Sequence, residues 1–257
     1  MANLRKKDFL RPPNHFSPGY FWFLNDRLEV DRMLAQLRDM RRHGARSVCL
    51  HPFPKDFRPA TLPSTMSPEY LSPDFFRIIR RIVAECEKLG MNYWLYDEGG
   101  WPSGGACGQV MRIAPEKYAR RWLTGNPASP TRDVEACHPE TASPNPNLLH
   151  PEVTPLFLRL THERYRQAVG KHFGQTIRFT FTDEPTMPAT KLGERIGWTD
   201  DFPAYFRRKK GYPLEACFPA LLGPVETSDP ELLQKRIDYY DVRSELYLDR
   251  YLRPIRR

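Results

Sequence analysis

Apolar residues along the chain recur at two spacings in turn, one typical of buried strands and one typical of amphipathic helices. Short apolar runs predict strands at 20–24 (YFWFL), 46–50 (RSVCL), 93–96 (YWLY) and 176–182 (TIRFTFT). Apolar residues three and four positions apart predict helices at 29–42, 73–89 and 154–173. Two shorter helical pieces, at about 200–210 and 213–222, lead to a long helix that begins near Asp229. The pattern therefore predicts a strand followed by a helix, repeated four times.

The helix at 73–89 has the clearest boundaries. Ser72 is placed to accept the first unpaired N–H groups, and Pro73 suits the first helical position. Asp74 meets the positive end of the helix dipole, and Gly90 ends the helix.

Alternation of strands and helices means parallel strands joined by right-handed crossovers. Four such units fit either a small open sheet or half of a TIM-type (β/α)8 barrel. Polar residues gather at the carboxyl end of every predicted strand, which favours the barrel: Asn25, His51, Asp97, Glu98, Asp183 and Glu184. We predict an α/β fold, a partial barrel of about four β/α units. It forms a single domain over 1–257 with an irregular Pro-rich insertion at about 125–151.

Strand alternation predicts which polar side chains face the mouth of this barrel. In the fourth strand Ile177, Phe179 and Phe181 share the face expected to pack under helices, so Glu184 should point inward and Asp183 away. The same reasoning turns Cys49 and His51 inward in the second strand, with Val48 and Leu50 outward. In the third strand an outward Leu95 implies that Trp94, Tyr96 and Glu98 point inward. The predicted mouth holds Glu98, Glu184, His51 and Asn25, with Trp101 nearby.

Two carboxylates beside tryptophan rings are what glycoside hydrolysis requires. One acid protonates the departing oxygen, and one carboxylate activates water or attacks the anomeric carbon. Each residue also has a structural interpretation. Glu184 could cap the next helix, Glu98 could hold the glycine-rich loop after it, and His51 could be a structural hydrogen-bonding histidine. Asp97 and Asp183 suit the orientation of backbone or basic groups, and Trp22 suits the core.

Composition excludes several other classes. Hydrophobic residues make up 40% of the chain and aromatic residues 12%, enough for a folded core. The net charge of +8 comes from basic residues on polar helix faces, interleaved with acids, so we expect no nucleic-acid partner. No apolar run approaches the ~20 residues that a membrane span needs, so we expect no membrane partner. The N-terminus lacks the apolar segment of a signal peptide, and the five cysteines contain no Cys-x-x-Cys pair. We therefore predict a cytoplasmic protein without a disulfide framework or a zinc site.

The motifs together resemble a known family. An aromatic first strand ends in Asn25-Asp26 and a second strand in His51-Pro52. The segments YLSPDFF at 70–76, LGMNYWLYDEGGWPSGGACG at 89–108 and FTDEP at 181–185 follow. Over about residues 18–257, this order resembles the catalytic barrel of glycoside hydrolase family 106, the α-L-rhamnosidase-like enzymes. FTDEP also resembles the Asn-Glu-Pro strand ending of the wider retaining-glycosidase clan, where that Glu is the acid/base.

The resemblance implies a (β/α)8 barrel, hydrolysis of terminal α-L-rhamnosides with inversion, and a calcium ion near the sugar, for which no ligands are assigned. It makes Glu184 the catalytic carboxylate. The residues assigned to substrate binding are Glu98, Asp97, Trp101, His51, Asn25 and Asp183.

Family members are longer, with strands five to eight and β-sandwich domains after this point. An open parallel edge is a configuration that proteins avoid, so we expect a fragment completed by a second polypeptide or by a C-terminal half of the barrel. The partner of Glu184 would then lie in that half. The alternative function is a non-catalytic carbohydrate-binding or assembly fragment. A metal-dependent sugar isomerase or hydrolase is disfavoured, because the sequence has no His-x-His pair or dense carboxylate–histidine cluster.

Overall fold

The chain forms two compact units, each with its own sheet. The computed structural model describes residues 5–55, 63–134 and 145–256. The first unit consists of Met1–Cys107 and Arg159–Glu184, and the second of Gly108–Leu158 and Pro185–Arg257. The fold is α/β, with a four-stranded parallel sheet in the first unit and a three-stranded antiparallel sheet in the second. The described residues form an open sheet and no closed barrel, and the single domain over 1–257 stays a prediction.

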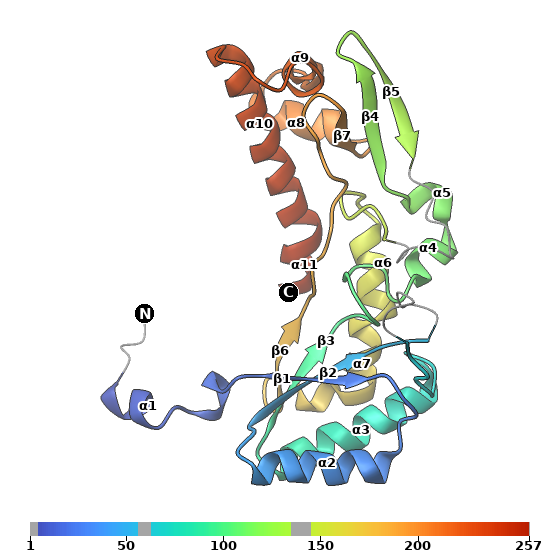
Figure 1. The fold of residues 1–257 in the computed structure, drawn as a ribbon, viewed down its shortest axis with the longest axis vertical. Coiled ribbons are helices and arrows are strands. Elements are labelled where there is room, and N and C mark those ends of the chain that lie inside the picture. Colours follow the sequence, from blue (N-terminus) through green and yellow to red (C-terminus); the bar gives the residue numbers. More distant parts are fainter. Residues whose placement is uncertain (1–4, 56–62, 135–144, 257) are drawn as a thin grey trace. The chain divides into compact units, whose positions relative to one another are not determined.

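The first unit contains the predicted strand–helix repeats (Figure 1). Its strands are β1 (Tyr20–Leu24), β2 (Ser47–Pro52), β3 (Asn92–Tyr96) and β6 (Ile177–Phe181). Its helices are α1 (Lys6–Leu10), α2 (Val30–Arg42), α3 (Pro73–Lys88) and α7 (His162–Val169), with 3₁₀ turns η1 (Asn14–Phe16) and η2 (Gly170–His172). The sheet order is β1-β2-β3-β6, and each neighbouring pair is parallel. The four predicted strands and their parallel arrangement are confirmed.

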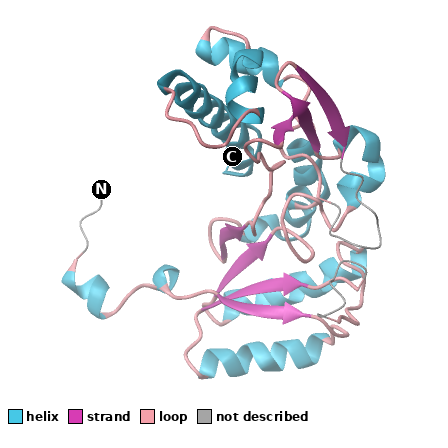
Figure 2. Ribbon diagram, turned by 45° about the horizontal axis from the view of Figure 1, so that its top comes forward, coloured by secondary structure: helices cyan, strands magenta, loops and turns pink. Residues whose placement is uncertain are grey.

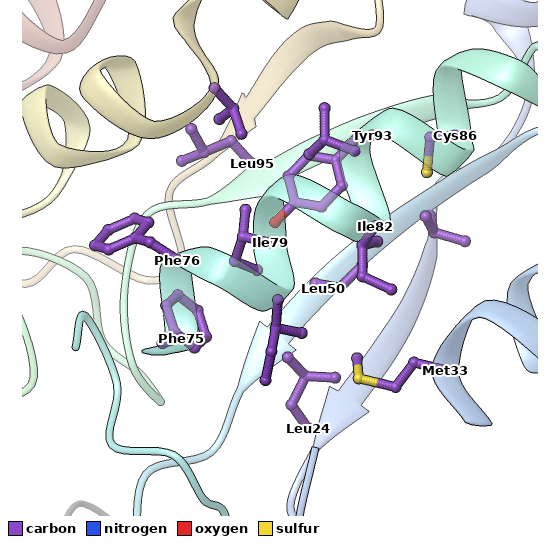
Figure 3. Packing of buried hydrophobic residues seen from close by; sticks show 14 of the residues in the cluster. Leu24, Met33, Leu50, Phe75, Phe76, Ile79, Ile82, Cys86, Tyr93 and Leu95 are labelled. Atoms are coloured by element: carbon purple, nitrogen blue, oxygen red, sulfur yellow. The ribbon is translucent and has the colours of Figure 1, made fainter. Parts of the chain in front are cut away.

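One face of this sheet packs on α2 and α3, which lie together beneath it in Figures 1 and 2. Val48 and Leu50 of β2 and Leu95 of β3 are buried in this core, as predicted. Figure 3 shows how α3 fills it, with Phe75, Ile79, Ile82 and Cys86 directed toward the strands. Burying such side chains contributes about 1.5–3 kcal/mol each. Ser72 caps α3 as predicted, because its side chain accepts a hydrogen bond of 3.1 Å from the N–H of Phe75.

A bulge in β6 overturns the predicted directions of its side chains. Tyr93 pairs with Ile177, but the next residue of β3, Trp94, pairs with Phe179. Arg178 is therefore an extra residue, and such an insertion reverses the alternation that follows it. Ile177 stays in the core beside the helices, whereas Phe179 packs on Trp94 on the opposite face. The prediction that Ile177 and Phe179 share one face is wrong.

The helix predicted at 154–173 is divided. It consists of α6 (Val153–Leu160) and α7, separated at Thr161, where φ is −118° and ψ is −78°. The Thr161 hydroxyl lies 2.9 Å from Nδ1 of His162, a local side-chain contact of the kind that competes with helical hydrogen bonding. The break lies close to the boundary between the two units, which falls after Leu158.

The second unit is built on an antiparallel sheet with the order β5-β4-β7. Its strands are β4 (Arg121–Asn126), β5 (Ser129–Val134) and β7 (Arg195–Trp198). Its helices are α4 (Gln109–Ile113), α5 (Pro115–Tyr118), α6, α8 (Phe202–Lys210), α9 (Phe218–Leu222), α10 (Pro230–Tyr247) and α11 (Arg253–Arg256). A 3₁₀ turn, η3 (Leu214–Cys217), precedes α9, and a π-helical turn, η4 (Leu248–Leu252), follows α10.

The start of the predicted irregular insertion is regular. β4 and β5 form a hairpin, and the Asn126 side chain accepts hydrogen bonds from the N–H groups of Ala128 and Ser129 at its turn. This use of Asn is typical of tight turns. Residues 135–144 of the insertion lie outside the described residues.

Two further predictions concern the chain as a whole. No disulfide joins the cysteines that the structure describes, Cys49, Cys86, Cys107 and Cys217. Cys137 lies outside the described residues. Within the described ranges, none of the helices combines the length and the apolar character needed to cross a bilayer.

Candidate functional site

A pocket of about 550 Å³ opens on the sheet face opposite the helices, at the carboxyl ends of the strands. All four parallel strands or the segments just after them contribute to its lining. The lining residues are Phe21, Phe23, Asn25, His51, Phe53, Trp101, Phe181, Asp183 and Glu184. Carboxyl ends of parallel strands are where α/β folds place ligand sites. The first unit alone therefore forms a site.

Aromatic rings make up most of the pocket wall. Phe21 and Phe23 of β1 are 46% and 51% exposed, although both are large apolar side chains. Phe21 meets Phe181 edge-on at 5.1 Å between ring centroids, and Trp101 lies 5.4 Å from Phe53. Exposed rings at a concave site offer flat apolar faces to a ligand. Trp101, His51 and Asn25 line this pocket, and their role in substrate binding stays a prediction.

Asp183 faces the pocket, which corrects the prediction that it points away. The bulge at Arg178 puts Phe181 and Asp183 on the pocket side. The Tyr96 hydroxyl donates to Oδ2 of Asp183 over 2.6 Å. The backbone of Asp183 is held as well, because its N–H donates to Oγ of Ser103 (2.8 Å) and its carbonyl accepts from the N–H of Ser103 (2.7 Å).

Glu184 also lines the pocket, at an unusual backbone conformation. Its φ is +44°, a left-handed value that side chains other than glycine rarely adopt. The residue is exposed. Left-handed residues gather at functional sites, where the surrounding structure offsets their cost of about 1–3 kcal/mol. Strand alternation alone would bring one of Asp183 and Glu184 to the pocket. The left-handed backbone at Glu184 brings both.

Glu98 does not line the pocket, and its predicted inward direction is wrong. Its side chain is fully buried under the glycine-rich loop. Five backbone N–H groups donate to its carboxylate. They belong to Gly99, Gly104, Gly105, Ala106 and Cys107. The carboxylate replaces the hydrogen-bond partners that a buried loop would otherwise lack. Glu98 therefore holds the glycine-rich loop together, which is the structural interpretation given for it in the sequence analysis.

Asp97 is likewise buried, at 0% exposure, and does not line the pocket. Its Oδ1 accepts a hydrogen bond of 2.6 Å from the Ser103 hydroxyl, and its Oδ2 lies 3.8 Å from Nε2 of His162. Asp97 therefore anchors Ser103, which in turn holds the backbone of Asp183. The substrate-binding assignment does not fit Asp97 or Glu98, because neither carboxylate reaches the pocket.

We call Asp97 and Glu98 the inner pair, and Asp183 and Glu184 the outer pair. Burial dominates the electrostatics of the inner pair. Burial raises the pKa of Glu98 to about 7, and the hydrogen bonds from the loop N–H groups act in the opposite sense. Burial also raises the pKa of Asp97 well above its usual range, while the hydrogen bond from Ser103 lowers it and the charge of Glu98 raises it further. The pKa of His162 falls to about 4 because the imidazole is desolvated.

Sequence reasoning missed the roles of Tyr96 and Ser103. Tyr96 stacks on His51, with ring centroids 3.8 Å apart, and holds Asp183. Ser103 joins the loop to the ends of β3 and β6. The inward direction predicted for Tyr96 was a usable signal. Ser103 carried no signal beyond its place among the glycines.

The calcium ion implied by the family resemblance stays a prediction. Among the residues that the structure describes, His, Cys, Asp and Glu side chains form no group of three or more that could hold a metal ion. Asp183 and Glu184 are the carboxylates of the pocket lining, and the other two predicted acids are enclosed. No residue is therefore assigned to a metal.

Comparisons with known proteins give a partial similarity among solved structures. No protein-family model matches the chain, and no curated protein matches it. Among solved structures, the chain is similar to a rhamnosidase from Novosphingobium sp. PP1Y, with 19% sequence identity and a TM-score of 0.35. The match covers 46% of this chain and 11% of that chain. It is a partial structural resemblance to a rhamnosidase.

Proposed function

We propose that the pocket binds a sugar and that the chain contributes to glycoside hydrolysis, with Glu184 as the proton donor. The observation that carries the proposal is one pocket that joins two carboxylates, Asp183 and Glu184, to a wall of aromatic rings. Aromatic faces pack on the C–H-rich faces of sugars, and carboxylates accept hydrogen bonds from sugar hydroxyls. The described lining contains neither lysine nor arginine, so it does not favour an anionic ligand.

The chemistry assigned to Glu184 is general acid catalysis. Its carboxylic acid protonates the glycosidic oxygen as the bond to the anomeric carbon breaks, and water supplies the hydroxyl group of the released sugar. The proton that the water loses balances the one that Glu184 gives up. Glu184 suits this role because it is exposed to a ligand, whereas Glu98 is enclosed by its loop. Terminal α-L-rhamnosides are the first substrates to test, because the motifs resemble those of family 106.

A second candidate is a sugar-binding protein without turnover. The enclosure of Glu98 favours it, because the two carboxylates of the described pocket then come from one segment, after β6. Glycosidases place their two carboxyl groups on opposite sides of the scissile bond, about 5 Å or more apart. A binding protein needs the aromatic wall and the polar groups alone.

The test measures turnover of an aryl α-L-rhamnoside by the wild type and by Glu184→Gln. The substitution removes the proton but keeps the size of the side chain, so kcat/KM should fall about 10²–10⁴-fold. Glu29→Gln is the matched control, because Glu29 is an exposed glutamate outside the pocket, and it should keep full activity.

Three outcomes are informative. Loss of turnover in Glu184→Gln alone supports the enzyme. Binding of L-rhamnose by the wild type without turnover, followed by titration calorimetry, supports the sugar-binding protein. Equal turnover in the wild type and Glu184→Gln would remove Glu184 from the mechanism.

A further inference from the structure

Tyr96 is fully buried and packs against two residues of the pocket lining. Its ring stacks between two lining residues, His51 at 3.8 Å and Phe181 at 5.7 Å between centroids, with interplanar angles of 27° and 11°. Stacking on both sides fixes the plane of the ring. Packing therefore fixes the position of the Tyr96 hydroxyl beside the Asp183 carboxylate.

The Tyr96 hydroxyl lies within reach of two acceptors. Oδ2 of Asp183 is 2.6 Å away, and the carbonyl oxygen of Gly100 is 2.9 Å away. A tyrosine hydroxyl carries one hydrogen but can also accept hydrogen bonds. Tyr96 can therefore donate to an ionised Asp183, or accept from a protonated Asp183 while it donates to Gly100. Both protonation states of Asp183 are hydrogen-bonded by the same groups.

We propose that Tyr96 is the positioning residue of Asp183, and that its hydroxyl turns between Asp183 and Gly100 as Asp183 loses or gains a proton. Asp183 is then a carboxylate that exchanges a proton with a pocket water or a sugar hydroxyl during the reaction. The proposal deepens the proposed function and rests on it for the identity of the ligand. It makes Asp183 more than a hydrogen-bond acceptor for substrate.

Three features indicate that the hydrogen bond from Tyr96 to Asp183 is part of an ordered arrangement. Ser103 fixes both backbone groups of Asp183, so the carboxylate is held at its base as well as at Oδ2. The Gly100 carbonyl belongs to a fixed turn, because the N–H of Gly100 donates to the carbonyl of Pro52 over 2.8 Å. Asp183 itself lines the pocket, where a ligand can reach it.

The neighbouring titratable groups favour a proton-exchanging role for Asp183. Lysine and arginine are absent from the described lining. β2, β3 and the segment after β6 contribute the titratable groups around Asp183 and Tyr96: Cys49, His51, Asp97, Glu98 and Glu184. Three of these groups are carboxylic acids, and the Tyr96 hydroxyl donates a hydrogen bond to the Asp183 carboxylate.

The experiment follows the pH titration of the Asp183 carboxyl carbon by ¹³C NMR in the full chain, with Asp183→Asn used to assign the signal. In the wild type, the ζ-carbon signal of Tyr96 should shift at the same pH as the Asp183 signal, because the hydroxyl exchanges its partner. In Tyr96→Phe, the Asp183 signal should titrate at higher pH than in the wild type, because the hydrogen bond to the charged carboxylate is stronger than the one to the neutral acid.

Tyr93→Phe is the matched control. Tyr93 is a buried tyrosine of the same strand, but it belongs to the core on the helix side and pairs with Tyr165. Removing its hydroxyl should leave the titration of Asp183 unchanged. The acidic limb of the profile of kcat/KM against pH should likewise be displaced in Tyr96→Phe and unchanged in Tyr93→Phe.

The two proposals fail separately. A Tyr96 signal that stays constant while Asp183 titrates would overturn the positioning role, and this measurement needs the wild type alone. An unchanged Asp183 titration in a folded Tyr96→Phe would overturn it too. Coupled NMR titrations in a chain without glycosidase activity would keep the positioning role and reject the proposed function.

Discussion

Two adjacent parallel strands of the first unit, β3 and β6, are each followed by the dipeptide Asp-Glu. β3 is followed by Asp97-Glu98, and β6 is followed by Thr182 and then Asp183-Glu184. Glu98 is fully buried and accepts five backbone hydrogen bonds, whereas Glu184 is exposed at the pocket. The same dipeptide, placed one residue later after β6 than after β3, therefore has two opposite environments.

The residues that follow each pair explain the difference. After Glu98 the chain has glycines at 99, 100, 104, 105 and 108, which let the backbone fold back over the carboxylate. Several loop residues take left-handed conformations, Ala106 (φ +51°) and Cys107 (φ +54°) among them, and direct their N–H groups inward. After Glu184 comes Pro185, which has no N–H to offer. A carboxylate becomes structural where backbone donors can surround it, and it stays available to a ligand where they cannot.

The largest effect expected from this comparison is on stability. Glu98→Gln replaces one acceptor oxygen by an NH₂ group that faces backbone donors, so several loop N–H groups lose their partner. Hydrogen bonds to a charged group contribute about 1.5–3 kcal/mol, and unsatisfied buried donors cost a similar amount. We expect the free energy of unfolding to fall by about 3 kcal/mol or more, measured by urea denaturation.

Glu184→Gln is the matched control for this measurement. It is the same substitution at the other pair, on an exposed side chain, and surface substitutions usually change stability by less than about 0.5 kcal/mol. Similar losses in the two variants would show that the loop does not depend on Glu98, and the contrast between the pairs would disappear.

The buried imidazole of His162, which lies beside Asp97, should also make the chain sensitive to acid. The pKa of its imidazole falls from 6.5 to about 4 because burial disfavours the charged form. The unfolded state therefore binds a proton between these values and the folded state does not, so stability is lost as the pH falls from about 6.5 to 4. At 1.36 kcal/mol for each pH unit, the loss reaches about 3 kcal/mol at most.

The variant His162→Gln should lack this part of the acid sensitivity. Asp97 acts in the opposite sense, because its raised pKa stabilises the folded state at low pH, but it is present in both proteins. The difference between the two curves of unfolding free energy against pH therefore reports on His162. The control His43→Gln removes an imidazole that is 78% exposed and should leave the curve unchanged in shape. Parallel curves for the wild type and His162→Gln would contradict the prediction.

Periodicity predicted most of the first unit. β1 was predicted with its observed bounds, and α2 and α3 within one residue, because apolar faces and end signals such as Ser72 and Gly90 agree there. The four-stranded parallel sheet followed from the alternation of these elements. The antiparallel sheet of the second unit was not predicted, because β5 contains charged and polar residues in place of an apolar run and β7 has four residues.

The site was predicted in its location and only partly in its residues. Strand ends brought Asn25, His51 and Asp183–Glu184 to one edge, which the order of the strands determines. The direction of Asp183 depends on one bulged residue, Arg178, and the TIRFTF sequence alternates without any sign of it. The burial of Glu98 depends on N–H groups from residues up to nine positions away, which no strand pattern contains. The cluster of glycines was the available signal.

The smallest expected effect has the opposite sign and concerns the backbone of Glu184. Its φ of +44° disfavours any side chain with a Cβ by about 1–2 kcal/mol, and glycine avoids this cost. Glycine is more flexible in the unfolded chain, which offsets about 0.5–1 kcal/mol of the gain. Glu184→Gly should therefore be about 0.5–1 kcal/mol more stable to urea than Glu184→Ala, while both lose turnover.

Comparing glycine with alanine isolates the backbone, because both variants lose the same carboxylate and its contacts. Greater stability of Glu184→Gly would mean that the outer pair is held in a strained conformation that favours the pocket over stability, as residues at functional sites often are. The inner pair should show no such gain, since Glu98 holds its loop together and every truncation there removes hydrogen bonds. If Glu184→Ala were as stable as Glu184→Gly, the left-handed turn would carry no strain, and exposure alone would separate the two pairs.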